Sequence, residues 1–116
     1  MGHRIAVIDG DEAVRELVRR WLVDAGHVVE TYPVLGNVGD VALVIADVAS
    51  PRVVKPLLSE LLQPVSGVAV LLISARFRKG QEGSVELADE LGVQGVLPKP
   101  FSKRQLLAAV AQALSR

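Results

Sequence analysis

The sequence predicts an α/β fold with a parallel sheet, and three observations support this prediction. Apolar runs without alternation recur along the chain, and such runs are typical of strands buried on both faces of a parallel sheet. Segments with apolar residues at helical spacing separate these runs. Strand and helix patterns therefore alternate, and this order favours right-handed crossovers between strands of one sheet.

The first predicted strand covers residues 4–8, and the first predicted helix follows it. Asp11 is a fair N-cap, and Glu12 adds an acidic residue to the first turn, where the helix dipole favours negative charge. Apolar residues at helical spacing continue as far as Ala25, and Gly26 is the stop signal.

A short strand, a loop and a longer strand come next. Residues 27–32 are predicted to form the second strand. Residues 33–40 are predicted to be a loop, because they hold two glycines, a proline and an asparagine. The third strand covers residues 41–46. Residues 51–63 are predicted to form a turn and then a helix, in which Pro56 fits only in the first turn.

The last part of the chain contains two more strands and two more helices. Residues 68–73 form the fourth predicted strand, and residues 76–83 are a polar loop with few expected contacts. A short helix over residues 84–91 ends at a glycine, and the fifth strand follows Gly95. Ser102 is the expected N-cap of a last helix that continues to the end of the chain.

Length and composition narrow the possible functions. We expect one domain over residues 1–116, large enough for a hydrophobic core. The thirteen basic and thirteen acidic residues balance, so direct nucleic-acid binding is not expected. The apolar run over residues 68–73 is too short to span a membrane. The chain has no cysteine and no signal peptide, which predicts a cytoplasmic protein, and an output domain would lie outside it.

Four predicted strands are each followed by a residue with reactive or charged chemistry: Asp9, Asp47, Ser74 and Lys99. Parallel strands place their carboxyl ends along one edge of the sheet, so these side chains should converge there. An aspartate in such a site can be a nucleophile toward a phosphoryl group. Mg²⁺ with a Lys or Arg would neutralise the charge of that group.

The stretches around these residues resemble the receiver domain of bacterial two-component response regulators. The resemblance covers essentially all 116 residues, and its matching stretches are residues 5–17, 44–51, 71–75 and 92–101. It implies a flavodoxin-like, doubly wound sheet of five parallel strands in the order 2-1-3-4-5. It also implies a signalling module that is not an enzyme.

The resemblance implies roles for individual residues. Asp47 matches the phosphoacceptor, with Pro51 four residues after it. Ser74 matches the switch hydroxyl and Lys99 the pocket lysine, with a cis bond between Lys99 and Pro100. The implied ligands of Mg²⁺ are Asp9, Asp47 and the backbone carbonyl of Ala49.

Three departures from the family pattern weaken these implications. Gly10 stands where the family has its principal Mg²⁺-binding carboxylate, so we expect the metal site to be weak or absent. Val96 stands where the family has its switch aromatic. Only 22 positions run from Gly26 to Asp47 inclusive, so the second helix should be shortened or absent.

Some residues have a second interpretation. Asp11 is expected to be a helix cap, with a substitute metal ligand as the alternative. Arg76, Arg78 and Lys79 are expected to lie in a solvated loop; the alternative is that one of them reaches the pocket and replaces a missing cation. His3 and His27 are expected to be isolated surface residues.

The predicted function is therefore a receiver domain that accepts a phosphoryl group on Asp47 from a histidine kinase or phosphotransfer protein. Its further expected partners are an output domain or effector protein, and a second copy through the last helix. One alternative is a pseudo-receiver that works by protein interaction without phosphorylation. A small flavodoxin-like binder or hydrolase is disfavoured, because the strand-end loops have no glycine-rich phosphate cradle or nucleophile elbow.

Overall fold

The structure is a computed structural model that describes residues 2–34, 36, 38–50 and 68–115. The helix predicted over residues 51–63 and Pro51 lie outside the described residues. The elements in chain order are β1 (Arg4–Ile8), α1 (Glu12–Asp24), β2 (Val28–Tyr32), β3 (Leu43–Asp47), β4 (Ala69–Ser74), α3 (Val85–Leu91), β5 (Gly95–Pro98) and α4 (Lys103–Ser115). Each predicted strand is present, with bounds shifted by two residues at most.

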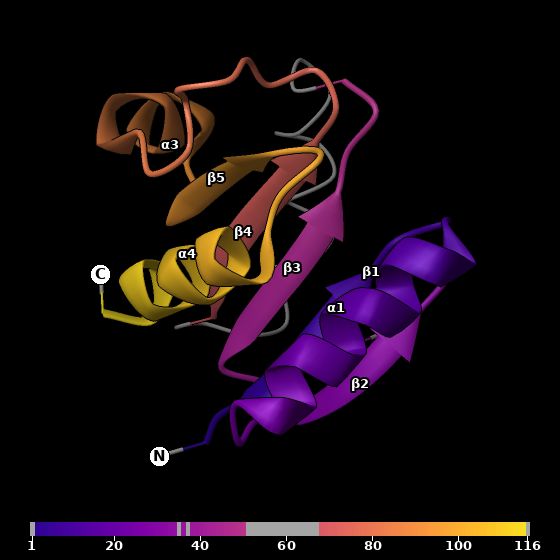
Figure 1. Cartoon of the computed structure of the whole chain (residues 1–116). Coiled ribbons are helices and arrows are strands. Elements are labelled where there is room, and N and C mark those ends of the chain that lie inside the picture. Colours follow the sequence, from indigo (N-terminus) through magenta and orange to yellow (C-terminus); the bar gives the residue numbers. More distant parts are fainter. Residues whose placement is uncertain (1, 35, 37, 51–67, 116) are drawn as a thin grey trace.

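The five strands form one parallel sheet in the order β2-β1-β3-β4-β5 (Figure 1). The predicted flavodoxin-like topology is therefore confirmed. β1 and β3 pair in register, with Val7 opposite Ile45, and β4 continues the row with Leu71 opposite Ile45. Because all strands run in one direction, β1, β3 and β4 end at the same edge, and the chain leaves β5 at that edge too.

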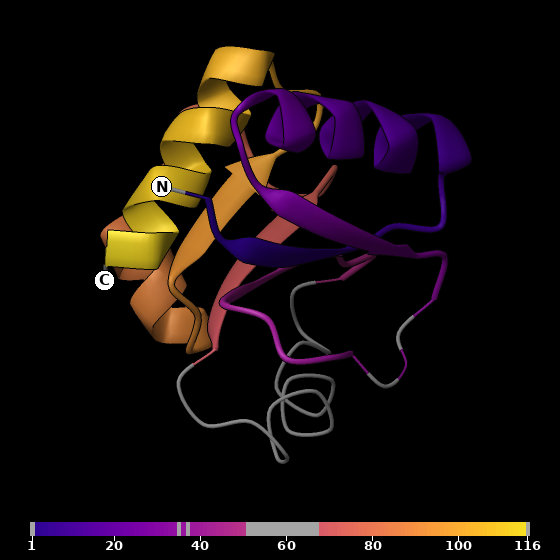
Figure 2. The same cartoon turned by 90° about the horizontal axis from the view of Figure 1, so that it is seen from below.

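Helices cover the two faces of the sheet, and alternate residues of each strand pack against them. Figure 2 shows α1 and α4 together on one face and α3 on the other. Val7, Ile45 and Leu71 belong to the core on the side of α1 and α4, whereas Leu72 belongs to the core on the side of α3. All four side chains have no exposed surface, as expected for central strands buried on both faces.

The helix ends carry the caps that the sequence predicts. The carboxylate of Asp11 accepts hydrogen bonds from the backbone N–H groups of Ala13 and Val14 and so caps α1. Ser102 Oγ accepts from the N–H of Gln105, whose side chain accepts from the N–H of Ser102 in return. This reciprocal pair is a capping box, and it fixes where α4 begins after β5.

Two connections between elements differ in how well the sequence predicts them. Between Tyr32 and Leu43 none of the described residues is helical, in line with the expectation of a shortened or absent second helix there. The connection between β4 and α3 is better anchored than its polar sequence suggests, since Phe77 is 6% exposed and packs in the core on the α3 side. In the described part of the chain, helices are too short or too polar to cross a membrane.

Candidate functional site

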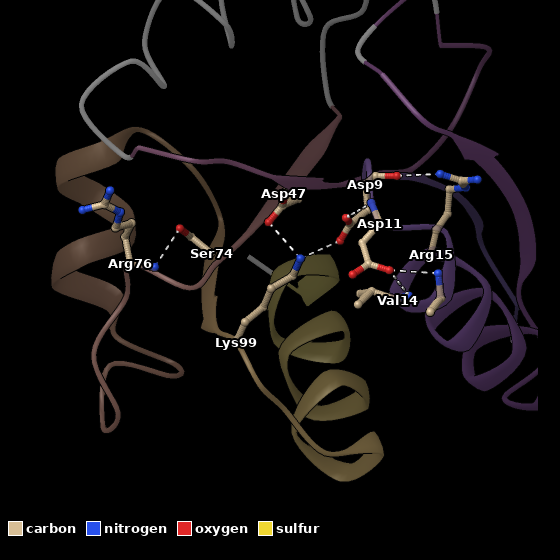
Figure 3. Close-up of polar contacts among 9 residues, drawn as sticks. Asp9, Asp11, Val14, Arg15, Asp47, Ser74, Arg76 and Lys99 are labelled. Atoms are coloured by element: carbon tan, nitrogen blue, oxygen red, sulfur yellow. Dashed lines mark hydrogen bonds and ion pairs between the residues drawn. The ribbon is translucent and has the colours of Figure 1, made fainter.

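Three of the predicted site residues meet at the carboxyl edge of the sheet. Asp9 follows β1, Asp47 ends β3, and Lys99 follows β5. The Lys99 ammonium lies between the two carboxylates, with Nζ 2.8 Å from Asp9 Oδ2 and 3.0 Å from Asp47 Oδ1 (Figure 3). Residues separated by 90 positions, Asp9 and Lys99, are thus joined by a direct hydrogen bond.

Every polar atom of Asp9, in the backbone and in the side chain, takes part in a hydrogen bond. Its side chain is 1% exposed. Its backbone N–H donates to the Tyr32 carbonyl, and its carbonyl accepts from the Arg15 guanidinium at 2.8 Å. Its Oδ1 accepts from the N–H of Asp11 at 2.9 Å, and its Oδ2 accepts from Lys99. Asp9 is therefore a buried and fully hydrogen-bonded carboxylate, as buried polar groups usually are.

Asp47 is the accessible carboxylate of the pair. Its side chain is 31% exposed, so solvent reaches it. Its Oδ1 faces Lys99, and its second oxygen has no hydrogen-bond partner in the described part of the chain. A carboxylate oriented by an ammonium, with one oxygen still available, is a suitable nucleophile for an electrophile that arrives from solvent.

Lys99 is the positive charge of the site. Burial lowers the pKa of its ammonium, but hydrogen bonds to Asp9 and Asp47 and their negative charges outweigh that effect, so the pKa is raised. The ammonium is therefore charged throughout the physiological pH range. The peptide bond to Pro100 is cis, as predicted, and the backbone N–H of Lys99 donates to the Ser74 carbonyl at 3.0 Å.

Ser74 lies beside this group without joining it. Its side chain is fully buried, and its Oγ accepts from the backbone N–H of Arg76 at 3.1 Å (Figure 3). The hydroxyl is thus used in a local turn, although Ser74 is at the expected edge of the sheet. Its backbone carbonyl accepts from both Phe77 and Lys99, so the Ser74 main chain links the β4–α3 connection to the site.

The basic residues after Ser74 lie in an exposed loop, as the first of the two interpretations predicts. Arg76, Arg78 and Lys79 are all exposed. In Figure 3 the Arg76 guanidinium points away from Lys99 and Asp47. No ion pair between this cluster and the pocket carboxylates is found among the described residues.

Arg15 is a residue of the site that sequence reasoning did not identify. It is the fourth residue of α1, at the end of the first turn, and its guanidinium reaches back to the carbonyl of Asp9. It thereby holds the turn of Asp9, Gly10 and Asp11 against the start of the helix (Figure 3). Its position six residues after Asp9 was visible in the sequence, but only the folded turn brings the two together.

The donor set of the site does not fit an ordinary Mg²⁺ site. Mg²⁺ prefers octahedral coordination by oxygen, with one or two carboxylates supplied by the protein. Gly10 supplies no carboxylate, Asp11 is used as a helix cap, and both oxygens of Asp9 already accept hydrogen bonds. Ala49 is exposed, and its carbonyl stays a predicted ligand only. No cluster of three or more acidic or histidine side chains able to hold a metal is found within the described residues.

An apolar cavity of about 340 Å³ adjoins the site. Its walls come from α1 and from the connection between β5 and α4, and they include Leu17, Lys99 and Phe101. Leu17 is 42% exposed, so part of this apolar wall is open to solvent. The cavity therefore offers an apolar surface to a molecule that approaches Lys99 and Asp47 from solvent.

Comparison with known proteins gives a consistent result. No known family model matches the chain. The chain is 30% identical over 118 residues to the transcriptional regulatory protein CpxR homolog of Haemophilus influenzae. This alignment covers 97% of the chain and 51% of that regulator, so the chain spans about half the length of this relative.

Solved structures share the fold. The BeF3-activated DrrB receiver domain is 25% identical with a TM-score of 0.75, and the match covers all of both chains. A response regulator from Thermotoga maritima is 18% identical with a TM-score of 0.76, again over all of both chains. At 18% identity, the Thermotoga maritima protein is similar to the chain in fold alone. The DrrB receiver domain and the CpxR homolog are similar to it in sequence as well.

Proposed function

This chain is a receiver domain of the response-regulator type, and we propose that in the cytoplasm it accepts a phosphoryl group on Asp47 from a histidine kinase or a phosphotransfer protein. The observation that carries this proposal is the difference between the two pocket carboxylates. Asp47 is 31% exposed, whereas Asp9 is 1% exposed. Only Asp47 combines contact with the Lys99 ammonium and access from solvent.

The proposed step is a phosphoryl transfer between two side chains. The free oxygen of Asp47 attacks phosphorus, the bond from phosphorus to the donor's histidine nitrogen breaks, and an acyl phosphate forms. Lys99 is placed to balance the added negative charge, because an ammonium has three N–H donors and two are used by the carboxylates. A third donor is thus available for a phosphoryl oxygen.

The apolar cavity beside Lys99 supports a protein as the donor. A protein that carries a phosphohistidine needs a surface to pack on while the histidine reaches Asp47. The exposed Leu17 and the side chain of Phe101 line such a surface next to the site. The proposal further includes an output domain or effector as the recipient of the signal.

Acetyl phosphate is the direct test of this proposal. The protein would be incubated with acetyl phosphate, with and without Mg²⁺, and its intact mass measured. We expect the wild type to gain one phosphoryl group and Asp47→Asn to gain none. Lys99→Ala should shorten the life of the phosphorylated state, since it removes the charge that stabilises it. An equal mass gain in Asp47→Asn, or none in the wild type under any condition, contradicts the proposal.

A second candidate function is favoured by one observation, the glycine at position 10. Without a carboxylate there, the pocket is poor in metal ligands, and phosphoryl transfer usually relies on a divalent cation. In that case the domain works as a pseudo-receiver that binds its partner without phosphorylation. The two candidates differ in Asp47→Asn, which would leave partner binding unchanged only in a pseudo-receiver.

A further inference from the structure

We infer that Lys99 is the resident cation of this pocket and that the described residues form a site that works without bound Mg²⁺. The inference deepens the proposed function and concerns the same pocket. It rests on three observations: how the carboxylate oxygens are used, what Gly10 does in the fold, and where the Lys99 ammonium lies.

The first observation is that few oxygens remain for a metal. The pocket has two carboxylates and therefore four carboxylate oxygens. Asp9 Oδ1 accepts from the N–H of Asp11, Asp9 Oδ2 accepts from Lys99, and Asp47 Oδ1 faces Lys99. Only the second oxygen of Asp47 is left among the described residues. Each of the other three oxygens already accepts a hydrogen bond or faces an ammonium, so a metal ion would share them with these donors and compete with Lys99 for two of them.

The nearest substitute carboxylate is not available either. Asp11 follows Gly10 directly, but its Oδ1 caps α1 through the N–H groups of Ala13 and Val14, at 2.9 and 3.2 Å. Turning this side chain toward Asp47 would remove the cap and leave the N–H groups of Ala13 and Val14 without their acceptor, which destabilises the start of the helix. The local structure thus holds Asp11 at the helix and away from metal binding.

The second observation is that the described residues do not require a glycine at position 10. Gly10 does not have a positive φ, unlike Gly26 or Gly92. Within the described part of the chain, a Cβ at this position would meet the carbonyl oxygen of Pro33 alone, at 3.7 Å, which is an ordinary van der Waals distance. The backbone would therefore accept an aspartate at position 10. Steric exclusion by the described residues therefore does not explain why the pocket has no carboxylate at position 10.

The third observation is that Lys99 occupies the centre of the negative charge. Its Nζ lies 2.8 and 3.0 Å from the two carboxylates, which is hydrogen-bond distance for a charged pair. A divalent cation would meet the repulsion of this ammonium and would compete with it for the same oxygens. In the proposed phosphoryl transfer the balancing charge would then come from Lys99 alone.

The test compares Mg²⁺ binding by the wild type, Gly10→Asp and the matched control Gly10→Asn, with no phosphoryl donor present. Binding would be measured by calorimetry and by the amide resonances of residues 10 and 11. We expect no saturable binding to the wild type or Gly10→Asn at millimolar Mg²⁺. Gly10→Asp should bind roughly tenfold or more tightly than Gly10→Asn, because only the aspartate adds a charged oxygen ligand. Saturable millimolar binding by the wild type, or equal binding by both variants, overturns the inference.

A second variant tests the part assigned to Lys99. Lys99→Met keeps most of the length of the side chain but removes the competing charge, so we expect it to bind Mg²⁺ more tightly than the wild type. Unchanged or weaker binding contradicts a resident cation. If this variant does not fold, the two variants at position 10 still decide the matter. Because no measurement uses a phosphoryl donor, a failure of Asp47 phosphorylation is distinguishable from a failure of this inference.

Discussion

Two aspartates of one pocket have different exposure, and the backbone explains why. Asp9 follows β1, which lies between β2 and β3 in the sheet, and its turn is held by Arg15 and Lys99. Asp47 ends β3 and contacts the same ammonium, but about a third of its side chain remains exposed. One carboxylate is therefore buried, and the other is partly open to solvent. The two residues have the same side chain, and their positions in the fold give them different exposure.

A second pair of residues leads to a prediction about pH. His3 and His27 lie together, with ring centroids 5.9 Å apart, and the backbone N–H of His3 donates to His27 Nδ1. Burial, followed by the charges of His3 and the N-terminus, lowers the pKa of His27 from its usual 6.5. The folded state thus binds fewer protons here than the unfolded state, and stability increases with pH.

The expected outcome is a loss of stability as pH falls below about 6.5, through the lowered pKa of folded His27. Urea unfolding of the wild type and of His27→Asn between about pH 5 and 8 would check this. Asn keeps an acceptor for the N–H of His3 but does not titrate, so its pH dependence should be the smaller of the two. Identical pH profiles would remove His27 as the cause.

Residues at strand ends could be predicted from the sequence, whereas side-chain directions could not. Asp9, Asp47 and Lys99 follow apolar runs, and parallel strands must bring such ends together. Ser74 follows the same rule, yet its hydroxyl bonds to Arg76, because a rotamer choice within a turn leaves no pattern in the sequence. The prediction that His3 and His27 are isolated was wrong. Their contact depends on β1 and β2 lying side by side, which the local sequence does not show.

At the scale of elements, the connection between β4 and α3 behaves as a structured unit. Phe77 is buried in the core on the α3 side, and its N–H donates to the Ser74 carbonyl. Side chains of Gln81 and Glu82 accept from the N–H groups of Arg78 and Gly80 within the same connection. Its polar composition predicts few contacts, but a single aromatic residue is enough to anchor it.

Phe77→Ala is therefore expected to destabilise the domain by about 3–5 kcal/mol, the usual cost of removing a buried phenylalanine. Val85→Ala is the control, because Val85 is 47% exposed at the start of α3 and should change stability by less than about 0.5 kcal/mol. Urea unfolding would measure both, and amide exchange of residues 78–83 should become faster in Phe77→Ala alone. Equal effects of the two variants would show that Phe77 is not the anchor.

Among the elements, those with end signals were predicted best. Asp11 and Ser102 cap their helices as expected, and Gly92 ends α3 with a φ of 73° that favours glycine. The start of β3 was less certain, because Val41 and Ala42 are apolar and continue the pattern of the strand without belonging to it. Ala42 already donates to the Arg4 carbonyl and accepts from the N–H of Ala69, so the boundary of β3 is not sharp.

At the scale of the molecule, the sheet is the part on which all other elements depend. Leu72 lies in the middle of β4, fully buried against the α3 side of the core. Leu72→Ala should cost about 2–5 kcal/mol by cavity formation. Val28→Ala in the edge strand β2 is the matched control, since Val28 is 57% exposed. Chemical denaturation would compare them, and a shift below about 0.5 kcal/mol for Leu72→Ala would reject its central place.

The topology was the most predictable property of the whole chain. Unbroken apolar strands such as residues 68–73 require cover on both faces, and alternation with helices supplies it. The strand order came from the resemblance and not from periodicity, because apolar runs of similar length do not show which neighbours they choose. The shape of the site follows from this order, since it places β1 and β3 side by side and β4 next to β3.

The positions of β2 and β5 at the two borders of the sheet have a consequence for aggregation. An edge strand has unpaired N–H and C=O groups, and strands of other chains can pair with them and build cross-β assemblies. β5 has only four residues and ends at Pro98, which has no N–H to donate, and β2 has five residues with the charged Glu30 at its centre. Both borders are thus short and interrupted, so growth of fibrils by strand addition is disfavoured while the domain stays folded.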